Sequence, residues 1–196
     1  MIVLGITGSV GMGKTTAARA FARAGYPVFD ADACVHELLG TDPRTIAAVR
    51  RAFPSVVRNG VVDRKALGAL VFAHDSALAK LESLLHPRVR ARQRAFVREA
   101  KKARHRVAVV DVPLLFETGG DREVDATLVV TAPLAQQRAR VLARRGMTRA
   151  RFDAIRKRQL SDREKRQRAT YVVDTGSGRA MMLRQIRTIL ATLEAQ

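Results

Sequence analysis

Near its amino end the chain carries a glycine-rich stretch whose residue types and spacing suit phosphate binding. Residues 8–16, GSVGMGKTT, match the pattern G-x-x-x-x-G-K-[ST] and are called the phosphate loop below. Glycines let the backbone fold tightly and turn several N–H groups toward one anion. Lys14 would reach the β- and γ-phosphates of a nucleotide, and the Thr15 hydroxyl would bind Mg²⁺. The stretch therefore predicts a site for a nucleoside triphosphate.

The segments that flank this loop have the order that a phosphate site needs. Ile2–Thr7 is a short apolar run that predicts a buried strand, and residues 16–23 predict a helix that ends at Gly25. The N-terminus of a helix carries a partial positive charge, which would add to the field of the loop. The alternative is a glycine-rich turn with an incidental lysine, but the strand–loop–helix order favours the phosphate site.

Two aspartates follow the next predicted strand and are candidates for acid–base chemistry. Residues 26–30 predict that strand, which ends in Asp30-Ala31-Asp32. Ligands of parallel α/β sheets bind at the carboxyl ends of the strands. A hydroxyl that receives a phosphoryl group needs an oriented carboxylate to accept its proton. Alternatively, either aspartate caps a helix predicted over residues 33–39.

A third acid closes the clearest buried strand of the sequence. Residues 106–111, RVAVVD, form a continuous apolar run that ends in Asp111. A carboxylate at this point can hold Mg²⁺ through water. Glu117 ends the apolar turn that follows. The alternatives are a cap or a structural hydrogen bond for Asp111, and a surface charge for Glu117.

Length and composition limit the class of protein. The 196 residues suffice for one domain with a substantial core and a small lid. No apolar run approaches the ~20 residues of a membrane span, and the first apolar run is too short for a signal peptide. Cys34 is the single cysteine, so it forms no internal disulfide. We expect a cytoplasmic protein with Cys34 in its core. The sequence sets no oligomeric state, and the working expectation is a monomer.

The net charge of +18 raises the question of a polyanionic partner. Residues 138–168 contain 13 Lys and Arg against three acids, and residues 88–106 contain nine against one. Such clusters suit polyphosphates or nucleic acid, although many of these charges would simply form solvated helix faces. Two tyrosines and no tryptophan offer few platforms on which single-stranded bases could stack. Nucleic-acid binding is therefore the less favoured alternative.

Strands alternate with helices along the chain, which predicts a parallel sheet covered by helices on both faces. The expected core comprises residues 1–30, 105–133 and 170–196, approximately. Residues 31–104 would form a helical insertion that binds the acceptor, by analogy with kinases of this fold. Residues 138–168 would form an arginine-rich lid that excludes water and neutralises charge during phosphoryl transfer. All three parts belong to one expected domain.

Turn and cap residues divide the insertion into helices. The predicted elements are a helix over residues 42–53, a turn over 57–62, a helix capped by Asp63 to about 73, a helix from Asp75 or Ser76 toward Leu85, and a long basic helix to about Arg104. His86-Pro87 is expected to interrupt the last two. In the remainder, strands are predicted over 125–130 and 171–174, and helices over 134–145, 149–159, 161–168 and 179–193.

Several nucleotide-binding classes are excluded by missing motifs. No N-K-x-D run is present to read guanine, and no Asp is followed by Gly three residues later, as a GTPase switch would need. Asp111 is followed by Val112 rather than by the Glu that helicases and related motors carry. A small-molecule kinase remains, with a nucleoside monophosphate kinase among its forms.

The sequence resembles the dephospho-CoA kinase family over nearly its whole length. The resemblance lies in TGSVGMGKTT (7–16), VFDADACVHELL (28–39), LESLLHPRVR (81–90), DVPLLFE (111–117), QRARVLARR (137–145) and the run RQLS (158–161) with Glu164 and Lys165. The D-A-D and L-H-P blocks are far more specific than the phosphate loop alone. The implied fold is that of α/β P-loop NTPases of the nucleoside-monophosphate-kinase type, with a helical acceptor-binding insertion and a helical lid.

The resemblance also implies a reaction and roles for particular residues. The reaction is ATP-dependent phosphorylation of the ribose 3′-hydroxyl of dephospho-CoA, the last step of CoA synthesis, with Mg²⁺ as cofactor. Asp32 would be the base and Lys14 would act on the phosphates. The expected ATP-binding residues are Gly11, Met12, Gly13, Lys14, Thr15, Thr16, Arg140 and Arg144. His86 and Arg90 would bind the acceptor, although His86 alone reads as a helix-end residue. Thr15 and Asp111 would hold the metal.

The last predicted strand departs from the family pattern A-D-x-V-I-D-N-x-G. Residues 169–176 read ATYVVDTG, so that Thr170 and Thr175 replace the usual Asp and Asn. This loop lies near adenine in related kinases. Main-chain contacts to the base would survive these replacements, whereas side-chain contacts would change.

Overall fold

The computed structural model describes residues 1–195 and divides them into two units. Unit 1 comprises Met1–Phe29 and the chain from Val97 onward, and unit 2 comprises Asp30–Phe96. Unit 2 is thus a single continuous segment inserted into the chain of unit 1. Each unit has its own hydrophobic core.

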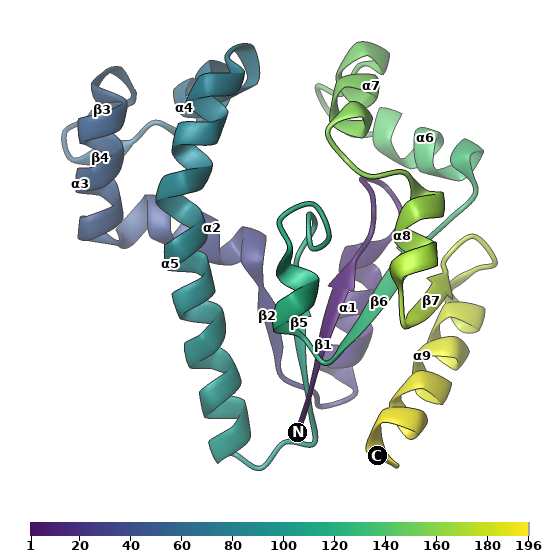
Figure 1. The fold of residues 1–196 in the computed structure, drawn as a ribbon. Helices are drawn as coiled ribbons and strands as arrows, with labels where there is room; N and C mark the ends of the chain where they lie inside the picture. Colours follow the sequence, from purple (N-terminus) through teal and green to yellow (C-terminus); the bar gives the residue numbers. More distant parts are fainter. Residues whose placement is uncertain (196) are drawn as a thin grey trace. The chain divides into compact units, whose positions relative to one another are not determined.

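Unit 1 is built on a five-stranded sheet. Its strands are β1 (Ile2–Thr7), β2 (Val28–Asp30), β5 (Val107–Asp111), β6 (Ala126–Thr131) and β7 (Tyr171–Asp174). They follow the order β2-β5-β1-β6-β7 (Figure 1). The pairings of β1 with β5, β1 with β6, and β6 with β7 are parallel. The carboxyl ends of these strands therefore lie at one edge, where ligands of such sheets bind.

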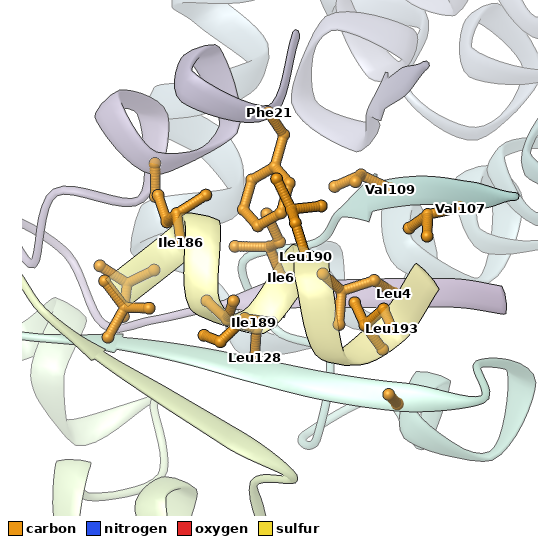
Figure 2. Packing of buried hydrophobic residues seen from close by; sticks show 14 of the residues in the cluster. Leu4, Ile6, Phe21, Val107, Val109, Leu128, Ile186, Ile189, Leu190 and Leu193 are labelled. Carbon is orange, nitrogen blue, oxygen red and sulfur yellow. The ribbon is translucent and has the colours of Figure 1, made fainter. Parts of the chain in front are cut away.

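Two helices cover one face of this sheet. Alternate residues of a strand point to the same face, and Leu4 and Ile6 of β1 pack against Phe21 of α1 (Lys14–Arg23) and Leu190 of α9 (Arg179–Glu194) (Figure 2). Phe21, Leu4 and Ile6 are fully buried. One face of the sheet and the apolar sides of both helices share this core. The first and last helices of unit 1 therefore pack in the same layer on the sheet.

The opposite face of the sheet is covered by α8 (Asp162–Arg168) and by the loop that follows β5. Thr131 points to this face, and its hydroxyl donates to the Asp162 carboxylate over 2.9 Å. A Cβ on Gly5 would lie 2.9 Å from Leu115, so the loop packs directly on β1. The predicted parallel sheet with helices on both faces is thereby confirmed.

The rest of unit 1 is formed by α6 (Leu134–Leu142), α7 (Arg149–Lys157) and the short helix η2 (Gly120–Glu123). Thr148 caps α7, since its hydroxyl accepts from Arg151 N. Ser161 and Glu164 form a capping box at the start of α8. Each polar residue that precedes a helix here satisfies N–H groups that have no intrahelical acceptor.

Unit 2 contains α2 (Ala31–Thr41), α3 (Pro43–Ala52), η1 (Pro54–Val56), β3 (Val57–Arg58), β4 (Val61–Val62), α4 (Arg64–Ala73) and α5 (Asp75–Lys102) up to Phe96. Residues from these elements form one apolar cluster that includes Val49, Leu67 and Leu81. The predicted turn over residues 57–62 is a tight hairpin, in which Asn59 and Gly60 have φ of 50° and 76°.

The predicted interruption at His86-Pro87 is wrong, because α5 runs without a break through Pro87. A proline inside a helix removes one N–H, here the donor for the Ser83 carbonyl, and costs about 3 kcal/mol. The Arg88 guanidinium donates to the neighbouring Leu84 carbonyl over 2.5 Å. Leu85, two residues before the proline, is buried in the core of unit 2. Packing of the helix face thus outweighs the local cost of Pro87.

Two expectations from composition concern membranes and Cys34. Among residues 1–195, no helix combines the length and the apolar character that a bilayer crossing demands. Cys34 is buried in α2 with 8% of its surface exposed, as expected for a core residue. Burial, followed by the charge of Glu37, raises the pKa of this thiol.

Candidate active site

The phosphate loop joins β1 to α1 and is shaped by its glycines. Gly11 and Gly13 have φ of 79° and 91°, a region that residues with a side chain rarely adopt. A Cβ on Gly11 would overlap Val141 of α6, and a Cβ on Gly8 would lie 2.6 Å from the Val130 carbonyl oxygen. The loop therefore needs glycine both for its turns and for the close approach of its neighbours.

Helix α1 begins at Lys14, two residues before its predicted start. Gly13 is its N-cap, and no side chain caps this helix. The first N–H groups of a helix lack intrahelical acceptors, so those of Lys14 and Thr15 are available to an anion at the loop. The earlier start places Lys14 and Thr15 in the first turn, where the helix dipole is felt most strongly.

Lys14 lies against the acid that ends β5. Lys14 Nζ is 2.5 Å from Asp111 Oδ1, and the two side chains are only 15% and 4% exposed. Asp111 pairs in register with Ile6, next to the end of β1. Lys14, the proposed phosphate-binding residue, and Asp111, the proposed metal-binding residue, thus meet at the carboxyl edge of the sheet. Asp111 also makes a structural hydrogen bond here, which is the alternative interpretation of this residue.

The residues at this edge fit a Mg²⁺ ion carried by a nucleotide. Mg²⁺ prefers oxygen ligands, keeps several waters and uses one or two protein groups besides the phosphates. The Thr15 hydroxyl and the Asp111 carboxylate are such oxygens. In the described part of the chain, no three acids, histidines or cysteines gather as a cluster for an ion held by protein alone.

Arg140 of α6 is connected to the phosphate loop by hydrogen bonds through Thr175. Its guanidinium donates to Thr175 Oγ1 over 2.9 Å and to the Thr175 carbonyl over 3.0 Å. The Thr175 hydroxyl in turn lies 2.7 Å from the Met12 carbonyl, to which it donates. Arg144 is exposed beyond the end of α6. A threonine at position 175 therefore links α6, the end of β7 and the phosphate loop.

Thr170, the other residue that departs from the family pattern, makes hydrogen bonds to the neighbouring strand. Thr170 N donates to Thr127 Oγ1 over 3.0 Å, and Thr127 N donates to Thr170 Oγ1 over 3.1 Å. This reciprocal pair joins the residue before β7 to β6. Thr170 thus fastens an edge strand to its neighbour.

In unit 2, the two aspartates of the D-A-D block, Asp30 and Asp32, have different structural positions. Asp30 is the N-cap of α2, and its Oδ1 accepts from Ala33 N over 2.9 Å. Asp32 lies in the first turn of α2, is exposed, and does not cap the helix. His86 and Arg90 are four residues apart on α5, which places them on one face of that helix.

Glu117 is an internal ion-pair partner rather than a surface charge. Its Oε1 accepts from Leu160 N over 2.9 Å and lies 2.9 Å from Lys165 Nζ. The Lys165 side chain is fully buried, which sequence alone did not indicate among so many exposed basic residues. The segment that enters α8 is thus held to the loop after β5.

A cavity of about 500 Å³ lies beside the phosphate loop within unit 1. Ser9 and Met12 of the loop, Gln137 of α6 and the residues that join α7 to α8 line it. Arg156 and Lys157 add positive charge. Gln137 and Gln159 lie in stretches that resemble the family, but the sequence assigns them no role, because an uncharged polar residue gives no sign of its partner.

Comparison with known proteins identifies the family of this chain. Residues 2–180 match the dephospho-CoA kinase family. This chain belongs to that family. A dephospho-CoA kinase from Rhodopseudomonas palustris is 53% identical over 97% of this chain and 95% of its own length. One from Paramagnetospirillum magneticum is 54% identical over 85% of this chain and 78% of its own length.

Solved structures agree with the fold of this family. A Thermus thermophilus protein has a TM-score of 0.84 and 36% identity, covering 98% of this chain and 97% of its own. A dephospho-CoA kinase from Campylobacter jejuni has a TM-score of 0.73 and 21% identity over the same shares, which supports the fold alone. The predicted family and the P-loop kinase fold are confirmed.

Proposed function

We propose that this protein transfers the γ-phosphoryl group of ATP to the ribose 3′-hydroxyl of dephospho-CoA, giving CoA and ADP. One observation carries the proposal beyond family membership. The uncapped start of α1 and the Lys14–Asp111 pair meet at the carboxyl edge of the sheet, and this arrangement suits the phosphates of a nucleotide.

On the ATP side, the N–H groups from Gly11 to Thr16 and the Lys14 ammonium bind the β- and γ-phosphates. Lys14 exchanges the Asp111 carboxylate for phosphate oxygens when the nucleotide enters. Thr15 and Asp111 would hold Mg²⁺, which offsets phosphate charge when bound. Arg140 and Arg144 supply further positive charge from the proposed lid, residues 138–168.

On the acceptor side, Asp32 accepts the proton of the 3′-hydroxyl. The ribose oxygen then forms a bond to the γ-phosphorus, in line with the bond from that phosphorus to the β–γ bridging oxygen. The latter bond breaks, and the bridging oxygen leaves as part of ADP. Asp32 is suited to this role because Asp30 already caps α2 and leaves Asp32 exposed. His86 and Arg90, on the proposed acceptor-binding insertion, bind dephospho-CoA. The reaction belongs in the cytoplasm, where ATP is supplied.

The proposal is tested by an acceptor screen with coupled detection of ADP. Dephospho-CoA should give ADP and CoA in equal amounts, with the new phosphate on the 3′-oxygen. AMP, CMP and shikimate serve as competing acceptors, since a nucleoside monophosphate kinase is the nearest rival. Turnover of AMP or CMP without turnover of dephospho-CoA would replace the proposal with that rival.

The role of Asp32 is tested by Asp32→Asn, with Asp30→Asn as its matched control. Loss of a general base lowers kcat by about 10²-fold or more. Asn at position 30 still caps the helix, so that variant should turn over at a rate close to that of the native protein. Equal rates for the Asp32→Asn variant and the native protein would remove Asp32 from the reaction.

A further inference from the structure

Val10, which lies between Ser9 and Gly11 in the phosphate loop, is bound on both its polar groups by glutamines. Gln137 Nε2 donates to the Val10 carbonyl over 2.8 Å, and Val10 N donates to Gln159 Oε1 over 3.2 Å. We propose that Gln137 and Gln159 are positioning residues that fix the loop in its phosphate-binding shape. The proposal rests on the proposed function for the identity of the nucleotide.

The two glutamines supply bonds that the loop does not make for itself. Val10 belongs to no helix or strand, so ladder or helical partners do not fix its peptide groups. Within the loop, Met12 N donates to the Ser9 carbonyl and Thr16 N donates to the Gly13 carbonyl, and neither bond involves a polar group of Val10. An amide side chain that donates with one atom and accepts with another suits both groups. The orientation of the Val10 peptide groups then depends on these two side chains.

Gln137 reaches the loop from a helix that is pressed against it. Its side chain is buried, with 2% of the residue exposed. A Cβ at Gly11 would come within 2.9 Å of the Gln137 main-chain oxygen, so α6 approaches the loop backbone directly. A buried amide in this position has little freedom to leave its partner, because an unpaired buried polar group costs free energy.

Gln159 reaches the loop from the segment between α7 and α8, and that segment is itself anchored. The next residue, Leu160, donates its N–H to Glu117 Oε1 over 2.9 Å. Glu117 also lies 2.9 Å from the buried Lys165. One end of the arginine-rich lid is thereby fastened to the loop after β5 and to the phosphate loop. Gln159 therefore links the lid to the site of the nucleotide's phosphates.

Both glutamines line the cavity of about 500 Å³ beside the loop, together with Arg156 and Lys157. Any change in the lid that moves Gln159 frees the N–H of Val10. Val10 then loses one of the two side-chain hydrogen bonds that hold its peptide groups. The arrangement makes the shape of the phosphate site dependent on the lid, through a neutral residue rather than through a lid arginine.

The test compares nucleotide binding by the native full-length protein and by the variants Gln137→Met and Gln159→Met, measured by calorimetry. Methionine keeps the length of the side chain and removes both amide functions. Losing one such hydrogen bond should weaken ADP binding by about threefold to tenfold. Affinity for AMP, which has no β-phosphate to meet the loop, should stay unchanged. Gln167→Met, an exposed position on α8, is the control and should bind ADP like the native protein.

The double variant separates joint positioning from two independent losses. Because both side chains hold one residue, the combined loss of ADP affinity should be smaller than the product of the single losses. In the acceptor assay, the KM for ATP should rise more than kcat falls. Should Gln137→Met fail to fold, Gln159→Met alone carries the test, since Gln159 is only half-buried.

Native ADP affinity in both single variants would overturn the proposal, as would equal losses for ADP and AMP, which indicate a general structural defect. The binding measurements need no acceptor. A protein that binds ADP as described but fails to convert dephospho-CoA would therefore contradict the proposed function and leave this inference standing.

Discussion

Lys14 and Asp111 neutralise each other in the absence of nucleotide. Their side-chain atoms lie 2.5 Å apart, and both groups are largely removed from water. A buried ion pair adds little net stability, but removing one partner leaves the other charge uncompensated. Lys14, the residue proposed to bind phosphate, therefore also keeps the charge of Asp111 compensated within the fold.

This dual role gives a prediction for Lys14→Met. The variant should lose ATP turnover and should also unfold more easily, by about 3 kcal/mol, because the buried Asp111 carboxylate loses its ion pair with Lys14. Thermal and urea unfolding monitored by circular dichroism measure the loss. The Lys14→Met, Asp111→Asn double variant is the control, and it should recover most of the stability while staying inactive. An unchanged melting temperature for Lys14→Met would show that Asp111 does not depend on Lys14.

The roles of residues that belong to a local sequence motif could be predicted from sequence. The roles of residues that depend on contacts with distant parts of the chain could not. The spacing of Gly8, Gly13 and Lys14 predicts an anion site because local backbone geometry determines it. Lys165 and Gln137 lie in stretches with ordinary helical composition. Their burial depends on Glu117 and Val10, which are distant in the sequence, and no local pattern reports such contacts.

At the scale of the element, caps decide where the helices of unit 2 begin. Asp42 Oδ2 accepts from Thr45 N over 2.7 Å and from the Thr45 hydroxyl over 2.5 Å at the start of α3. The hydroxyl bond and then the amide bond lower the pKa of the Asp42 carboxyl. A lowered pKa in the folded state stabilises the fold above the pKa of the unfolded chain, and this stabilisation disappears as the pH falls through the folded value.

We therefore expect Asp42→Ala to lower the free energy of unfolding by about 1 kcal/mol at neutral pH. The difference between this variant and the native protein should shrink in acid, once the native carboxyl is protonated. Asp42→Asn, whose amide oxygen accepts at every pH, is the matched control and should show a flatter pH dependence than the native protein. Melting curves at neutral and acidic pH measure both effects. A constant difference across this range would mean that the Asp42 charge plays no part in the cap.

Helix α5 illustrates where element prediction fails. Proline is a local signal for a break, and the sequence around His86-Pro87 predicts one. The structure keeps the helix because Leu81 and Leu85 belong to the core of unit 2. Tertiary packing of this kind is not visible in a window of sequence. The sequence does predict β7 at its observed bounds, because a short apolar run ending in Asp174 is followed directly by a glycine-containing turn.

At the scale of the whole molecule, the net charge of +18 acts on the folded state. Excess charge of one sign destabilises a compact chain through self-repulsion. Raising NaCl from about 10 mM to about 1 M shortens the Debye length from about 30 Å to about 3 Å. The melting temperature should therefore rise with NaCl, in calorimetric scans without nucleotide.

Binding of an anion at the phosphate loop would also raise the melting temperature, so the salt series needs a control. The Lys14→Met variant carries a weakened anion site and should still gain stability with NaCl in parallel with the native protein. A gain confined to the native protein would assign the effect to the loop, and a falling melting temperature would contradict the role of self-repulsion.

The order of the two units along the chain has a consequence for synthesis. Unit 2 is one continuous segment, whereas the sheet of unit 1 pairs Ile2 with Val107 and Val129 with Val172. During translation the helical insertion leaves the ribosome complete and can bury its own apolar side chains at once. The apolar strand β1 must wait for partners that are made much later, so the nascent chain needs its amino end shielded until the carboxyl half has emerged.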